Sequence, residues 1–264
     1  MIDAIKMPAY LQELFAYRSV FYQLVRQYLV LRYRRTVLGF VWTLVNPLLM
    51  LSVTALVFST IFKLDLATYS TYLFAGMVPW TFFSTSTTQA CGSLISNEGL
   101  IKKIYLPKII FPLSVCVGNL FDSLLSFVAL FILIAVFGST ISWALLFIPI
   151  AFILIFLFTL GFSLALSTLT VYFRDVQYVV GILLQAVFFL TPIIYKRDGL
   201  SGWAADLVAL NPLLHFIDLF RLPLYQGVLP HASTILAAVS MSLLSLGVGA
   251  LVFVKHEKKI VFRL

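Results

Sequence analysis

Charged residues are scarce in this chain of 264 residues: 11% are Asp, Glu, Lys or Arg, whereas 62% are hydrophobic. Soluble domains carry about 25% charged residues. A soluble fold of this length could not hide so much apolar surface from water, so the composition excludes a soluble domain. It predicts a protein whose surroundings are the hydrocarbon of a lipid bilayer.

Motifs for ATP binding, metal binding and catalysis are also missing. None of the 13 glycines is followed by lysine, so the chain has no G-x-x-x-x-G-K-[ST] phosphate-binding loop. The three histidines, His215, His231 and His256, are scattered and lack a metal-ligand spacing. We interpret the two cysteines, Cys91 and Cys116, as reduced core residues. The sequence therefore predicts a protein that is not an enzyme, and any ATP that drives it must bind to another subunit.

The sequence contains several long uncharged runs instead. The first extends from Val37 to Phe62 and directly follows Arg32, Arg34 and Arg35. About 20 apolar residues span a bilayer, and basic residues cluster at the cytoplasmic end of a span, so we expect this helix to start in the cytoplasm. The later runs complete an all-α membrane domain over residues 1–264 with both termini in the cytoplasm. The six predicted spans are residues 38–62, 69–90, 109–137, 141–173, 177–195 and 233–254.

The net charge of +8 follows the same topology. Of the 18 Lys and Arg residues, 14 fall in segments predicted to be cytoplasmic, and 4 fall outside. This bias is the positive-inside rule of membrane proteins. It explains the basic composition without a nucleic-acid partner.

Two cytoplasmic segments have an apolar side that a plain loop would not need. In residues 1–35, apolar and aromatic side chains recur every three or four positions from Leu14 to Leu31, which predicts an amphipathic helix lying in the membrane interface or packed on a partner subunit. Residues 93–108 combine Leu100, Ile101 and Ile104 with lysines. The second segment is either a solvated loop or a helix that docks on a cytoplasmic partner.

Polar residues inside the predicted spans also need an explanation. Asn119, Asp122, Ser123 and Ser126 fall on one face of the third span. An acid at membrane depth is costly and normally faces protein or water. The face therefore either hydrogen-bonds to a neighbouring helix or lines a substrate or proton path.

Residues 196–232 contain apolar pieces that are each too short to cross a membrane. We expect two short helices that enter the outer leaflet and return. Such re-entrant backbone persists only where it is buried in protein or lines a cavity.

Several short motifs are distributed along the six predicted spans and the segments between them. They are Arg32-Tyr33-Arg34-Arg35-Thr36-Val37-Leu38-Gly39-Phe40-Val41-Trp42 with Asn46-Pro47, Gly76-Met77-Val78-Pro79-Trp80-Thr81-Phe82-Phe83, Tyr172-Phe173-Arg174-Asp175, Thr191-Pro192-Ile193-Ile194-Tyr195 and Asn211-Pro212. Over nearly its whole length the chain resembles the membrane permeases of ABC type 2 exporters of O-antigen, capsular polysaccharide or teichoic acid.

This resemblance implies a homodimer in the bacterial cytoplasmic membrane, with a channel at the dimer interface. It implies two copies of a separate cytoplasmic ATPase subunit, which bind ATP and magnesium, whereas this chain binds no cofactor. The implied substrate is a glycan on a lipid-pyrophosphate carrier. The segment that docks on the ATPase would comprise Asn97, Glu98, Leu100, Ile101, Lys102, Lys103 and Ile104.

The resemblance also assigns roles at the two membrane faces. Residues 196–232 match the family's outer gate, with Trp203, Asn211, Pro212, Phe216 and Phe220 as its candidate residues. The N-terminal helix matches an interface helix near the substrate entrance. Five arginines there would attract the pyrophosphate, although the positive-inside rule alone explains them equally well. They are Arg18, Arg26, Arg32, Arg34 and Arg35.

Aromatic rings suit the passage of sugars because they combine apolar platforms with polar tips. Each of these rings could instead face lipid or the protein core. The candidates for lining the channel are Trp42, Trp80, Phe82, Phe83, Phe188, Phe189 and Tyr195.

Three other functions are weighed against polysaccharide export. A secondary transporter could use Asp122 as a proton site, but the chain shows one intramembrane acid and no evident repeat. A membrane-bound transferase would need clustered acidic, His or Cys residues at one face. An ABC exporter of a small lipid or drug stays within the same family.

Overall fold

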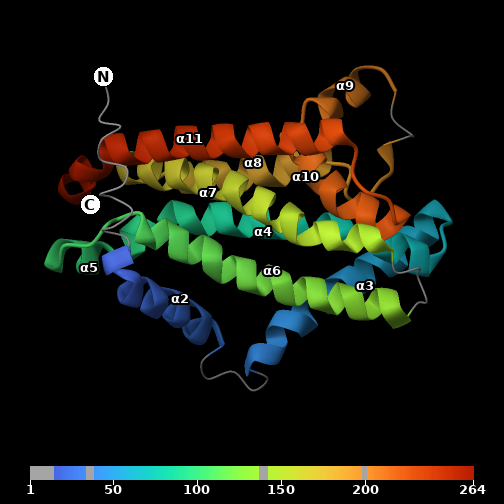
Figure 1. Ribbon diagram of the computed structural model, residues 1–264, viewed down its shortest axis with the longest axis horizontal. Coiled ribbons are helices and arrows are strands. Elements are labelled where there is room, and N and C mark those ends of the chain that lie inside the picture. The colour runs from blue at the N-terminus through green and yellow to red at the C-terminus, as the bar shows by residue number, and fades with distance from the viewer. Residues whose placement is uncertain (1–14, 34–38, 137–141, 198–200) are drawn as a thin grey trace.

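The computed structural model describes residues 15–33, 39–136, 142–197 and 201–264. Within these ranges all regular structure is helical and no strand occurs, so the predicted all-α fold is confirmed. The long helices run side by side along the long axis (Figure 1). Short helices α9 and α10 lie at one end of the bundle, and α5 lies at the other end with the C-terminus.

The helices cover both the long apolar runs and several shorter charged segments of the sequence. In chain order they are α2 Arg18–Tyr33, η2 Gly39–Val41, α3 Trp42–Phe62, α4 Leu66–Ser96, α5 Glu98–Lys103, α6 Ile110–Val136, η3 Trp143–Phe147, α7 Ile148–Tyr172, α8 Val176–Leu190, α9 Trp203–Ala209, α10 Pro212–Arg221, the π-helix η5 Leu222–Gln226 and α11 Ala232–Arg263.

Four helical stretches of the described chain are long and apolar enough to cross a membrane: Leu44–Phe62, Ile110–Phe131, Trp143–Tyr172 and Ala232–Arg263. They correspond to the first, third, fourth and sixth predicted spans. The two other predicted spans fall on α4 and α8. Helix α4 is long but rich in Ser and Thr, and α8 has only 15 residues. Crossing by α4 and α8 therefore stays a prediction.

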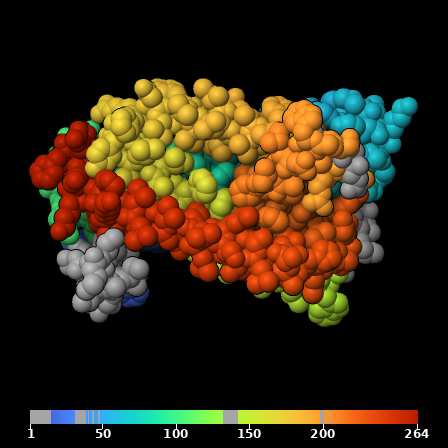
Figure 2. All heavy atoms as spheres, turned by 90° about the horizontal axis from the view of Figure 1, so that it is seen from above, coloured from blue at the N-terminus to red at the C-terminus, as the bar shows by residue number. Residues whose placement is uncertain are grey.

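Helix α4 is the centre of the molecule. It packs against α3, α6, α7, α8 and α10, and most of its residues between Tyr69 and Leu94 are buried. The space-filling view shows the middle of α4 at the bottom of a hollow between the surrounding helices (Figure 2). Because α4 touches protein on most sides rather than lipid, it tolerates the polar residues that make its composition unlike that of a lipid-facing span.

Helices α7 and α11 make the closest contact in the bundle. A Cβ atom at Gly161 would overlap the backbone of Ser245, and one at Gly249 would overlap the backbone of Gly161. Across the same contact, the hydroxyl of Ser242 donates to the Leu154 carbonyl oxygen at 2.8 Å, and that of Ser245 to the Phe158 carbonyl oxygen at 2.7 Å. Small residues and hydroxyl bonds are the usual means of joining helices in lipid, where hydrophobic attraction between helices is lost.

We therefore expect Gly161→Ala to destabilise the chain by about 1–3 kcal/mol, because the obstruction is backbone and cannot rotate away. Gly247→Ala, two residues before Gly249 but with nothing within 4 Å, should be neutral or stabilising by up to about 1 kcal/mol. Thermal unfolding of the detergent-solubilised chain measures both. Equal melting temperatures for the two variants would contradict the proposed contact.

Candidate functional site

A groove of about 640 Å³ lies between α4 and α8. Its wall combines aromatic rings with hydroxyl and amide groups, and it contains no charged side chain. We call it the α4–α8 groove. Its lining residues are Met77, Trp80, Thr81, Ser84, Thr85, Thr88 and Gln89 from α4, and Gly181, Leu184, Gln185, Phe188 and Phe189 from α8.

Three rings form a continuous row on one side of the groove. The Trp80 and Phe188 ring centroids are 5.4 Å apart, as are those of Phe188 and Phe189. Trp80 is buried, whereas Phe189 is 70% exposed. The hydroxyls of Ser84 and Thr88 donate to carbonyl oxygens of α4 at 3.3 and 2.8 Å. Their oxygens keep free lone pairs, so the groove offers apolar faces beside hydrogen-bond acceptors, a combination that suits sugar rings.

The other aromatic candidates lie elsewhere. Phe82 and Phe83 are buried, and their rings pack against Phe156 and Phe158 of α7 at 6.4 and 5.6 Å. Trp42 lies exposed at the start of α3. Tyr195 follows α8 and donates its hydroxyl to the Phe189 carbonyl oxygen at 2.9 Å. The structure thus brings Trp80, Phe188 and Phe189 together and leaves the rest outside the groove lining.

Beyond Leu190 the chain leaves the helix and forms a turn over residues 191–195. The guanidinium of Arg221, on α10, donates to the carbonyl oxygens of Pro192 and Ile193 at 2.8 and 3.3 Å. It also stacks 3.8 Å above the ring of Tyr72 on α4. The Tyr72 hydroxyl donates to the Tyr195 carbonyl oxygen at 2.8 Å. This buried arginine ties the C-terminal end of α8 to both α4 and α10.

Arg221 was not among the predicted site residues. Its signal was the presence of a cation inside the largely apolar segment Leu213–Leu224, within the region predicted to form short helices. A buried cation at such a place needs carbonyl or anionic partners.

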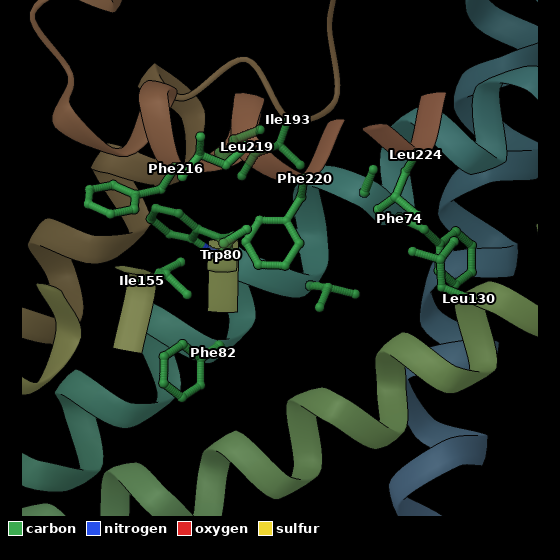
Figure 3. Close-up of a cluster of buried hydrophobic side chains, with 14 of the residues drawn as sticks. Phe74, Trp80, Phe82, Leu130, Ile155, Ile193, Phe216, Leu219, Phe220 and Leu224 are labelled. Carbon is green, nitrogen blue, oxygen red and sulfur yellow. The ribbon is translucent and has the colours of Figure 1, made fainter. Parts of the chain in front are cut away.

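Four of the five candidate outer-gate residues gather beside this turn. Phe216 and Phe220 are both 0% exposed and pack in one cluster with Trp80 and Ile193 (Figure 3). The side chain of Asn211 caps α10 by accepting from the Leu213 amide at 3.0 Å, and it donates to the Thr191 hydroxyl at 2.7 Å. Pro212 is the first residue of α10. Trp203 stands apart, 77% exposed at the start of α9.

Arg221→Ala should lower the free energy of unfolding by roughly 2–5 kcal/mol, because two buried carbonyl oxygens lose their donors. Arg197→Ala is the matched control. That guanidinium is exposed and lies 4.0 Å from Asp218, so its loss should cost less than about 1 kcal/mol. Thermal unfolding separates the two variants. A similar small shift for both would show that the turn does not depend on Arg221.

At the opposite end, α4 passes into α5 through Asn97, whose side-chain amide donates to the Ser93 carbonyl oxygen at 2.8 Å. Glu98 and Lys102 form an ion pair at 2.6 Å along α5. The hydrogen bond from Lys102, and then its charge, hold the pKa of Glu98 below the ordinary value, so the pair is formed at neutral pH. Residues 97–104 therefore form a short, ordered helical segment.

The two sides of this segment differ. Ile101 is buried, and Leu100 is partly buried against the same cluster. Lys102, Lys103 and Ile104 are exposed. One side is thus anchored on the bundle while the other is exposed.

The C-terminal part of α11 provides much of the anchor. The Glu257 carboxylate accepts a hydrogen bond from the Lys108 amide at 3.0 Å. Ile260 is fully buried and shares a cluster with Ile101 and Leu106. A displacement of α5 would therefore disturb its contacts with α11 as well as with α4.

The arginines predicted for the substrate entrance fall on or near α2. Arg18 and Arg26 are exposed on this helix, which packs on α6. Arg32 belongs to α2, but its side chain is outside the described part, and Arg34 and Arg35 fall in residues 34–38, which are not described. The structure shows the helical form predicted for this segment, and its place at the membrane surface stays a prediction.

The polar face of α6 is buried only in part. Asn119 and Ser123 are buried, and the Ser126 hydroxyl donates to the Asp122 carbonyl oxygen at 2.9 Å. Cys91 and Cys116 are buried free thiols, which agrees with their interpretation as core residues. Across the described ranges, no group of three or more His, Cys, Asp or Glu side chains is arranged to hold a metal ion.

The all-helical fold, with four stretches long and apolar enough to cross a membrane, has the character of an integral membrane protein. Residues 19–225 match the model of the ABC-2 type transporter family, and the chain belongs to this family. Permease subunits of such transporters are membrane components that work with a separate ATPase subunit.

Individual relatives narrow the comparison. The chain is 30% identical over 250 residues to the O-antigen export system permease protein RfbA of Myxococcus xanthus, covering 94% of this chain and 96% of the relative. It is 32% identical over 203 residues to RfbA of Klebsiella pneumoniae, covering 76% and 78%. It is 21% identical over 238 residues to the polysialic acid transport protein KpsM of Escherichia coli, covering 86% and 89%.

Proposed function

We propose that this chain is the permease subunit of an ATP-driven exporter that moves a lipid-linked polysaccharide across the bacterial cytoplasmic membrane. The observation that carries the proposal is the α4–α8 groove, where aromatic rings face hydroxyl and amide groups without a charged side chain. The relatives named for O-antigen export and polysialic acid transport support a glycan over a small lipid or drug.

The proposed topology has six crossings, formed by α3, α4, α6, η3 with α7, α8 and α11, and both termini lie in the cytoplasm. Helix α8 is about 22 Å long at 1.5 Å per residue, shorter than the roughly 30 Å of hydrocarbon. The turn at 191–195 extends it outward. Non-helical backbone is tolerated at that depth because Arg221 and Tyr72 satisfy its carbonyl groups. Helices α9 and α10 would form the re-entrant outer gate.

A second copy of the chain would complete the channel. Helix α8 has a single buried residue, Val180, and presents large apolar side chains outward beside the groove, including Ile182, Leu183 and Phe189. A homodimer that brings two such faces together would enclose both grooves. Two ATPase subunits, each holding ATP and magnesium, would lie below, and this chain itself would bind no cofactor.

The coupling and entrance roles follow from the same arrangement. ATP binding in the partner would displace α5, and the joint at Asn97 and the Glu257–Lys108 hydrogen bond would pass this displacement to α4 and α11. At the entrance, α2 would lie in the membrane interface, where Arg18 and Arg26 can meet the pyrophosphate of the carrier.

The chain purified from its native membrane should retain a soluble subunit that carries a phosphate-binding loop and hydrolyses ATP. Ile104→Asp should lower the amount of bound subunit about tenfold or more, because it places a carboxylate on the exposed side of the docking segment. Mass spectrometry and ATPase assays measure both. The variant should unfold at the same temperature as the wild type, since Ile104 is 48% exposed.

Ile104→Leu is the matched control and should retain the subunit. If the purified chain retains no ATPase, the exporter hypothesis fails, and a transporter driven through Asp122 becomes the leading alternative. If short lipids rather than glycans stimulate hydrolysis, the chain is an exporter of small lipids.

Phe189→Ala should reduce surface polysaccharide about twofold to tenfold, the range expected for the loss of one aromatic contact. Leu190→Ala is the control, because Leu190 is also exposed but lies outside the groove lining. Immunoblots of surface polysaccharide, normalised to the permease present in the membrane, measure the effect. Equal export from both variants would show that the groove is not part of the transport pathway.

A further inference from the structure

Three polar side chains from three helices meet at one end of the α4–α8 groove. They are Tyr28 of α2, Gln89 of α4 and Asn119 of α6. The Tyr28 hydroxyl is within hydrogen-bonding reach of the Gln89 Oε1 atom and lies 3.0 Å from Asn119 Oδ1. The amide of Asn119 donates to the same Gln89 oxygen at 3.0 Å. Gln89 is at the same time a lining residue of the groove.

The hydrogen-bonding pattern fixes the orientation of the Gln89 amide. Its oxygen is the acceptor shared by Tyr28 and Asn119, so its Nε2 group, with two N–H donors, is on the opposite side of the amide. Within the described part of the chain, no acceptor is bonded to these donors. The side chain of Gln89 is exposed. The amide nitrogen is therefore available to a molecule in the groove.

Tyr28 is itself held in place by packing. Its ring lies directly against Gly118 of α6, so closely that a Cβ atom there would overlap it. The adjacent residue, Asn119, is buried. The Tyr28 hydroxyl thus reaches Gln89 from a ring packed on α6, and this side chain connects α2 to the groove.

We propose that Gln89 is a specificity-determining contact of the transport pathway and that Tyr28 is the positioning residue that orients it. The Gln89 N–H donors bind an acceptor oxygen, a hydroxyl or ring oxygen, of the sugar that occupies this end of the groove. The inference rests on the proposed function, because it assumes that a glycan passes through the groove. It assigns the amphipathic helix α2 a role in setting the chemistry of the pathway in addition to its place at the entrance.

Gln89→Glu tests the donor directly. The carboxylate keeps the oxygen that accepts from Tyr28 and Asn119, so α2 stays docked, but both N–H donors are lost. In cells without the native copy, this variant should export about threefold to tenfold less surface polysaccharide, the range expected for one hydrogen bond, at an unchanged level of permease and bound ATPase. Gln185→Glu, on the α8 wall of the same groove, is the control for added charge and should have a smaller effect.

A double-mutant cycle tests the positioning role of Tyr28. Tyr28→Phe keeps the ring against Gly118 and removes only the hydroxyl, and alone it should lower export about threefold or more. Added to Gln89→Ala, it should have no further effect, because the group through which it acts is gone. Tyr22→Phe, on the exposed side of α2, should be silent in both backgrounds.

Three results would overturn the inference. They are wild-type export by Gln89→Glu, wild-type export by Tyr28→Phe, and an equal effect of Tyr28→Phe with and without Gln89, which would mean that Tyr28 only docks α2. Failure of the proposed function gives a different result: surface polysaccharide would be unchanged when the whole chain is absent.

Discussion

Hydrocarbon offers no hydrogen bonds, so each polar backbone group in a membrane needs a partner inside the chain. Helices meet this requirement by themselves, and the turn at residues 191–195 does not. Its carbonyl groups bond instead to Arg221, Tyr69 and Tyr72, which hold it between α4 and α10. The turn at the C-terminal end of α8 therefore depends on one buried guanidinium. At the other end of the groove, the side-chain oxygen of Gln89 accepts hydrogen bonds from Tyr28 and Asn119.

Much of the fold was predictable because long apolar runs allow little except helices. The predicted third span, 109–137, and the helix Ile110–Val136 nearly coincide. Differences arise where short-range chemistry ends or extends a helix. Helix α8 stops at Leu190, five residues before the predicted end at 195, because the residue before Pro192 is forced into an extended conformation. Helix α11 continues to Arg263, beyond the predicted 254, because Phe253 and Ile260 bury one side of its charged last turns.

The candidate site was less predictable than the fold. Composition shows that aromatic rings are abundant, but it does not show which side of α4 meets α8 and which meets α7. Trp80 therefore lines the groove while Phe82 and Phe83 pack in the core, although all three were equal candidates. The contacts of Tyr28 join residues 61 and 91 positions apart, and no periodicity reveals such pairs.

The contact between α7 and α11 has a consequence for biosynthesis. Helix α7 ends at Tyr172, and α11 begins only at Ala232, so α7 is made well before its closest partner. At a synthesis rate of about 5–20 residues per second, the small-residue face around Gly161 stays without its partner α11 for several seconds. During that interval the nascent bundle lacks the helix that also anchors the proposed docking segment through Glu257. The order of synthesis thus completes the proposed ATPase-docking surface only when the last helix has been inserted.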